Sequence, residues 1–132
     1  MMKKNERPLK PSDGELRILR VLWERGPSTV REVFEKIENN ANIGYTTVLK
    51  LMQIMHEKKF VQRDESTRSH VYNAAISREK TEERFVEDLL DSVFDGSKTR
   101  LVLQILGNSD ASKEELAEIS QLVQQIGKEK ES

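Results

Sequence analysis

Cysteine is absent from the 132-residue sequence, so disulfides, cysteine-based zinc sites and a cysteine nucleophile are excluded. Aromatic residues make up only 5% of the chain and charged residues 34%, which is typical of a protein rich in exposed helix rather than of an enzyme with a deep pocket. No apolar run approaches the roughly 20 residues that span a bilayer, and the polar, basic start has no signal-peptide core. We therefore expect a cytoplasmic protein with no direct membrane binding.

Familiar catalytic motifs are missing as well. His56-Glu57 lacks the second histidine of a zinc-protease motif, and no glycine-rich phosphate loop, dinucleotide fingerprint or serine nucleophile elbow occurs. The carboxylates alternate with lysine and arginine, as they do on solvated helix faces. The sequence predicts no enzyme activity, no cofactor and no metal site.

The net charge of −1 conceals an asymmetry along the chain. Residues 1–76 contain 14 Lys and Arg against 10 Asp and Glu, whereas residues 77–132 contain 8 against 13. A basic first part and an acidic second part indicate that only the first part meets a polyanion.

Three helices and a hairpin are predicted in the first part. Ser12 with Glu15 and Thr29 with Glu32 have the spacing of capping boxes, and a third helix is expected from Tyr45 to about Lys59. Their buried stripes, read from helical spacing, are Leu16, Ile18, Leu19, Leu22 and Trp23; Val30, Val33, Phe34 and Ile37; and Val48, Leu51, Met52 and Met55. Strand-like runs at 60–63 and 70–73 flank a polar tip. This order predicts a mainly α fold with a small β-hairpin wing, a winged helix-turn-helix over residues 1–76.

Three further helices are predicted in residues 77–132, the last capped by Ser112 with Glu115 and frayed from Lys128 to Ser132. They are too short to bury their apolar faces alone, so we expect a helical dimerisation domain. The alternative is that they pack back onto the first domain of the same chain. The residues expected at the homodimer interface are Leu89, Leu90, Val93, Leu101, Val102, Ile105, Leu116, Ile119, Leu122 and Val123.

The outer face of the third helix carries the candidate DNA-binding residues Thr46, Thr47, Lys50 and Gln53. Side chains near the start of a recognition helix reach base edges in the major groove, and Thr and Lys both have donors for bases or phosphates. The alternative is an ordinary solvated face. Tyr45 is expected to pack under the preceding turn, with a contact to the DNA backbone as the alternative.

Two more basic features are candidates for phosphate contacts. Arg68, with Ser69 beside it, lies at the predicted wing tip, although any soluble protein shows a charged hairpin tip. A basic arm, which would add affinity without sequence reading, is formed by Lys3, Lys4, Arg7 and Lys10. The alternative is a disordered start of the chain with no role.

Three blocks of sequence, Leu22–Pro27, Thr29–Val33 and Tyr45–Leu49, resemble the BlaI/MecI penicillinase repressor family in residues and in spacing. The resemblance covers nearly the whole chain. It implies a homodimeric transcriptional repressor that binds an inverted-repeat operator in double-stranded DNA and controls β-lactam-resistance or related stress genes. It also implies a membrane sensor protease of the BlaR/MecR type as a partner, which cuts the repressor in its dimer tail.

The chain departs from this family at the cleavage segment. Gln104 and Ile105 stand where the family has Asn and Phe, so this candidate cleavage site lacks the family's motif. The cysteine cluster of copper-responsive relatives is absent too. The competing interpretation is a winged-helix module for protein–protein interaction.

Overall fold

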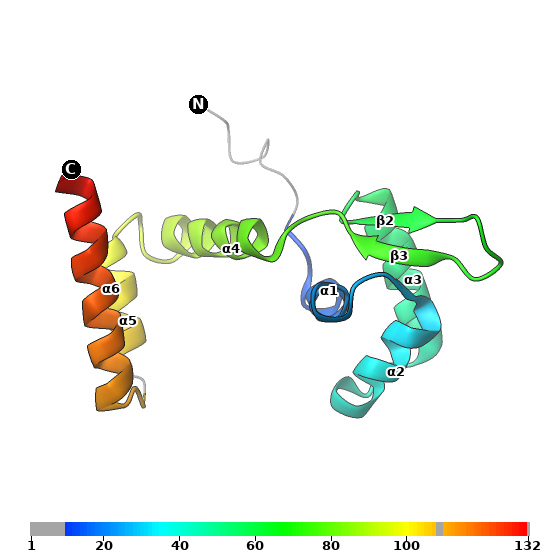
Figure 1. Ribbon diagram of the computed structural model, residues 1–132, viewed down its shortest axis with the longest axis horizontal. Coiled ribbons are helices and arrows are strands. Elements are labelled where there is room, and N and C mark those ends of the chain that lie inside the picture. Colours follow the sequence, from blue (N-terminus) through cyan, green and yellow to red (C-terminus); the bar gives the residue numbers. More distant parts are fainter. Residues whose placement is uncertain (1–9, 108–109, 132) are drawn as a thin grey trace. The chain divides into compact units, whose positions relative to one another are not determined.

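The computed structural model describes residues 10–107 and 110–131, without the side chains of 38–41. The chain divides after Glu87 into two compact units (Figure 1). The first contains α1 (Asp13–Arg25), β1 (Ser28–Thr29), α2 (Val30–Ala41), α3 (Tyr45–Glu57), β2 (Val61–Asp64), β3 (Val71–Ala74) and the beginning of α4 (Arg78–Ser92). The second contains the end of α4, α5 (Lys98–Gly107) and α6 (Lys113–Glu131).

The predicted capping boxes fix where the first two helices begin. The Ser12 hydroxyl accepts a hydrogen bond from the Glu15 backbone at 3.3 Å, and the Glu15 carboxylate accepts one from the Ser12 backbone at 2.9 Å. Thr29 and Glu32 repeat the arrangement at the start of α2, at 3.2 and 2.9 Å. Each box satisfies two backbone N–H groups that the helix leaves unpaired, so both predictions are confirmed.

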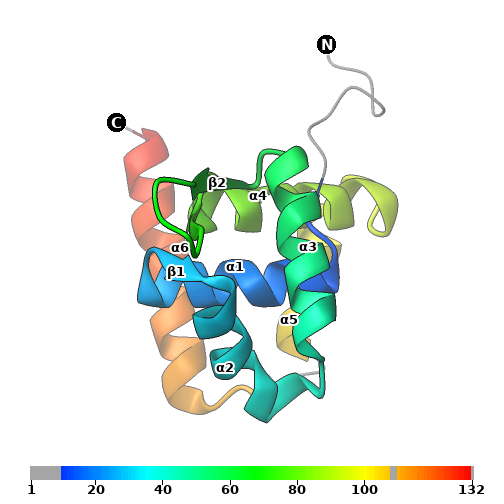
Figure 2. The same cartoon turned by 90° about the vertical axis from the view of Figure 1, so that its right-hand side faces the viewer.

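The core of the first unit lies among α1, α2, α3 and the sheet, with α1 running across α3 in Figure 2. Its most deeply buried apolar side chains, each at most 2% exposed, are Ile18, Leu19, Leu22, Val33, Val48, Met52, Met55, Val61 and Tyr72. The predicted tri-helical core is confirmed. Trp23 and Leu51 lie at its edge, and the Trp23 indole N–H donates to the Ile76 carbonyl at 2.9 Å.

The sheet has three antiparallel strands in the order β1-β3-β2. The predicted hairpin is present, with Arg63 opposite Tyr72 in its register. Strand β1 was not predicted, because two residues between a Gly-Pro break and a helix cap carry no strand pattern. Its Ser28 pairs with Tyr72 and is fully buried. The mainly α fold with a small sheet is confirmed.

The first turns of α4 belong to the first compact unit. Thr81 is only 4% exposed, and its hydroxyl donates to the Ser77 carbonyl at 2.7 Å. The predicted domain boundary after Ile76 therefore lies within this unit and stays a prediction.

The second unit exposes most of its apolar side chains. Within the part of it that the structure describes, Leu101 is the one buried hydrophobic residue, at 9% exposure. The capping box of Ser112 and Glu115 is confirmed, with both hydrogen bonds at 3.1 Å. The fraying predicted from Lys128 was wrong as far as Glu131, where α6 ends. Acidic residues in its first turn and lysines in its last complement the helix dipole, which stabilises both ends.

Candidate nucleic-acid interface

Helix α3 presents its predicted outer face to solvent. Val48, Met52 and Met55 are fully buried on the opposite side, and this fixes the rotation of the helix about its axis. The predicted contact residues Thr46, Thr47, Lys50 and Gln53 are all exposed. The helix begins after Gly44 with no side-chain cap, so its first N–H groups are open to a negatively charged group.

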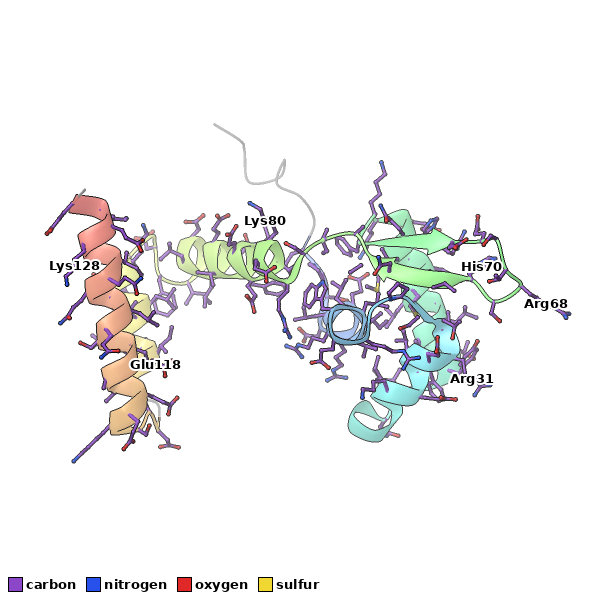
Figure 3. All side chains as sticks on the ribbon, in the orientation of Figure 1. Arg31, Arg68, His70, Lys80, Glu118 and Lys128 are labelled. Carbon is purple, nitrogen blue, oxygen red and sulfur yellow. The ribbon has the colours of Figure 1, made fainter. Side chains whose placement is uncertain are left out.

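The wing is the loop between β2 and β3, and it carries the predicted Arg68 and Ser69, both exposed. Figure 3 shows Arg68 at the tip, pointing away from the helices. Two local hydrogen bonds shape the loop: Ser66 N–H to the Asp64 carboxylate at 2.9 Å, and the Thr67 hydroxyl to the Ser69 carbonyl at 2.7 Å. The first of these lowers the pKa of Asp64. The tip therefore has a defined conformation before it meets a partner.

A hollow of about 380 Å³ separates α3 from the wing and the start of α2. The structure brings the predicted Gln53, Arg68 and Ser69 together at its wall. Its ionisable lining, within the described chain, comprises three arginines, two tyrosines and one histidine, with no carboxylate in the wall itself. One of the arginines, Arg63, is paired with Glu65, which lies outside the wall. A recess that concentrates positive charge beside an exposed helix suits a phosphate backbone.

Arg31 and His70 also line this hollow and were not predicted. Arg31 is exposed in the first turn of α2, and its guanidinium carbon lies 5.1 Å from the centre of the Tyr45 ring. The Thr29 cap gave a usable signal, because it places Arg31 at the start of a helix and off its apolar stripe. His70 had no comparable signal.

Tyr45 is 38% exposed, so the prediction that it packs under the turn was wrong. Its ring lies edge-on to Phe34, with the ring centres 5.6 Å apart and the planes at 84°. With Arg31 over it, the ring is held at the rim of the hollow rather than in the core. Val48, one turn further along α3, is fully buried, so the exposed rim begins at the first residue of the helix.

Arg63 lies at the base of the wing. Its guanidinium is paired with Glu65 at 2.6 Å and lies 6.0 Å from the centre of the Tyr72 ring. Tyr72 and then Glu65 raise the pKa of Arg63, so it stays charged. Its Nε–H is buried and has no hydrogen-bond partner in the described chain. A buried donor without an acceptor is rare in proteins, and an incoming oxygen would satisfy it.

Lys10, a predicted DNA-binding residue, does not line the hollow beside the wing. Its ammonium lies 5.0 Å from the centre of the Phe85 ring on α4. The other residues of the predicted basic arm, Lys3, Lys4 and Arg7, lie outside the described residues.

The predicted dimerisation residues are placed unevenly. Seven are largely exposed, at 41–62%: Leu89, Val93, Val102, Ile105, Leu116, Leu122 and Val123. Leu90 and Ile119 are half-buried, whereas Leu101 is buried inside its own unit. The candidate cleavage residues Gln104 and Ile105 are exposed within α5. So many exposed apolar side chains in one small unit are typical of an interaction surface.

Residues 10–107 and 110–131 were compared with the geometry of two further kinds of site, a metal centre and a membrane-spanning helix. No group of three or more potential metal ligands gathers there. None of the helices described is both long and apolar enough to cross a membrane.

The sequence profile of the penicillinase repressor family matches residues 11–125. Among curated relatives, the penicillinase repressor of Bacillus licheniformis is 23% identical over 114 residues, covering 86% of this chain and 89% of the relative. The transcriptional regulator BlaI of Mycobacterium tuberculosis is 28% identical over 114 residues, covering 81% and 83%. The solved DNA-binding domain of the repressor BlaI aligns at a TM-score of 0.49 and 19% identity, over 55% of this chain and 88% of that domain.

Proposed function

The chain belongs to the penicillinase repressor family, whose members are transcriptional repressors and not enzymes, and we propose that it binds an inverted-repeat operator as a homodimer. The observation that carries the proposal is the joint exposure of the α3 face and the positively charged hollow beside it. Genes for β-lactam resistance or a related stress response are the proposed targets.

In this proposal α3 enters the major groove with Thr46, Thr47 and Lys50 toward the base edges. Arg68 of the wing and Arg31 of α2 contact phosphates on the two sides of the hollow. Phosphate contacts fix the register of the protein on the duplex, and base contacts read its sequence. Gln53, one turn beyond Lys50, is within the same face and has both a donor and an acceptor for a base.

Two copies of the chain are needed for tight binding, because one small domain makes few contacts. We propose that the exposed apolar side chains of the second unit, from Leu89 to Val123, meet those of a second copy. The linked second domain then binds its half-site at a high effective concentration. Repression follows from occupying a promoter.

Release by cleavage at Gln104-Ile105, by a membrane sensor protease, is part of the proposal. Both residues lie inside α5, and a protease needs an extended segment in its active site. The bond therefore becomes accessible only when α5 opens locally. Loss of the apolar tail would separate the two operator-binding domains.

The test is a titration of fluorescent DNA from upstream of the protein's own gene, read by anisotropy. Lys50→Ala should weaken binding about tenfold, since a good base contact contributes roughly 1–3 kcal/mol. Lys36→Ala, which removes an exposed lysine from α2, is the control and should bind like wild type. Equal binding by all three proteins would remove Lys50 from the interface.

A further inference from the structure

A second cavity, of about 600 Å³, lies in the first unit and shares no lining residue with the hollow beside the wing. Its wall comes from the turn after α3, from the chain around Ile76 and from the first turns of α4. Its volume falls in the range of small-molecule sites, roughly 300–1,000 Å³. The proposed DNA contacts leave it unused.

Part of the wall is apolar. Phe60 is 5% exposed and Thr81 4%, and Ile76 is half-buried beside them. The Thr81 hydroxyl is already engaged with the Ser77 carbonyl, so it does not require a polar partner in the cavity. This part of the wall would cover a hydrocarbon group.

The charged part of the wall has four basic residues, Lys58, Lys59, Lys80 and Arg84, and two acidic ones, Glu83 and Glu87. Lys58 is paired with Glu15 at 3.0 Å, and Lys80 lies 3.7 Å from Glu83. Lys59 has no ion-pair partner among the residues described, and it is exposed in the turn that connects α3 to β2. An anion at the mouth would therefore find one lysine whose charge is not compensated.

We propose that this cavity binds a small organic carboxylate with an aryl or branched aliphatic body. The apolar wall takes the body, and Lys59 takes the carboxylate. A neutral molecule would lose the ionic contact, and a cation would meet an excess of positive charge that remains after Glu15 is counted against Lys58. Binding at this cavity does not depend on the proposed DNA contacts, which lie on other residues.

The experiment is an NMR titration of the ¹⁵N-labelled full chain with 4-phenylbutyrate, 4-phenylbutanol and 4-phenylbutylamine. We expect saturable shifts of the Phe60, Ile76 and Thr81 amides with the carboxylate. The alcohol should bind about fivefold more weakly, because a charge-assisted hydrogen bond exceeds a neutral one by about 1 kcal/mol. The amine should bind more weakly still.

The variant Lys59→Asn tests whether the Lys59 ammonium binds the carboxylate. Lys59 has a φ of 69°, and asparagine tolerates this left-handed conformation, so the turn is preserved. The variant should lose the preference for the carboxylate over the alcohol, whereas the control Lys36→Asn should keep it. Shifts confined to α5 and α6, equal binding of all three compounds, or an unchanged preference in Lys59→Asn would each overturn the proposal.

Discussion

The carboxylate of Glu15 and the ammonium of Lys58 form an ion pair at 3.0 Å across 43 residues of sequence. Glu15 is 1% exposed in the first turn of α1, and Lys58 follows the last residue of α3. The pair therefore ties the beginning of one helix to the end of the proposed recognition helix. The same carboxylate also completes the capping box with Ser12, so one buried group serves two structural roles.

The first prediction concerns the pH dependence of stability. Burial raises the pKa of Glu15. The hydrogen bond from the Ser12 backbone N–H and the contacts with Lys58 lower it by more, so the pKa is lowered from 4.5 overall. A carboxyl with a depressed folded pKa stabilises the fold above its unfolded pKa, and this stabilisation is lost as the pH falls through the folded value. Glu15→Gln should therefore flatten the fall in urea-unfolding free energy below about pH 4.5.

The same ion pair is tested from its other side by Lys58→Met. This change should lower the free energy of unfolding by about 1–2 kcal/mol at neutral pH, which is less than for a fully buried pair because a third of the lysine side chain is exposed. Urea unfolding at one fixed protein concentration measures it. The control is Glu57→Gln, which changes an exposed neighbour on α3. Equal stability of Lys58→Met and wild type would show that the ion pair contributes nothing.

Capping boxes and buried stripes were predictable because the residues that form them lie within a few positions of one another in the sequence. The two halves of the Ser12–Glu15 box are three residues apart, and Val48, Met52 and Met55 repeat at helical spacing. The Glu15–Lys58 pair and strand β1 were not predictable, because their partners lie more than 40 residues away. Tyr45 was misplaced because an aromatic residue at a helix start fits a core or a rim equally well.

In the candidate site too, the features set by local sequence were predictable and those set by distant contacts were not. The exposed α3 face followed from the position of its buried stripe, and Arg68 followed from the hairpin pattern. Arg31 and His70 join the site only because α2 and the wing meet around one hollow. This arrangement of α2 and the wing depends on tertiary packing, which cannot be predicted from the spacing of residues within either element.

The second prediction concerns Arg31 and the ring beneath it. Arg31→Ala should weaken binding to operator and scrambled DNA by a similar factor, and lower the salt slope by about one unit per subunit, as expected for a lost phosphate contact. Tyr45→Phe should keep operator affinity close to wild type, because the ring that supports Arg31 remains. Anisotropy titrations at several salt concentrations give both values. A loss confined to the operator sequence would instead assign Arg31 to base reading.

The third prediction separates interface residues from the interior of the second unit. Leu116→Asp and Leu122→Asp place charges on exposed apolar positions and should yield folded monomers in sedimentation-velocity runs. Leu101→Ala should instead lower the free energy of unfolding by about 2–3 kcal/mol, since it removes a buried side chain. Wild-type sedimentation of both aspartate variants would place the dimer contact elsewhere.

The fourth prediction concerns the Trp23 indole, which donates to Ile76 just before α4. Trp23→Phe keeps an aromatic ring but removes this donor, and should cost about 1–2 kcal/mol. Ligand-free unfolding in urea measures the loss. Retention of full stability would mean that this hydrogen bond does not help to hold the start of α4 in the first unit.

The most direct test of the central claim is the salt dependence of binding to DNA from upstream of the protein's own gene, with scrambled DNA as the control. The account predicts tight binding to one sequence by a dimer, with log affinity falling linearly and steeply with log salt as phosphates release counterions. Weak binding that is equal for both DNAs would contradict this claim for that operator. Binding that is insensitive to salt would contradict DNA recognition itself and favour a winged helix that serves a protein partner.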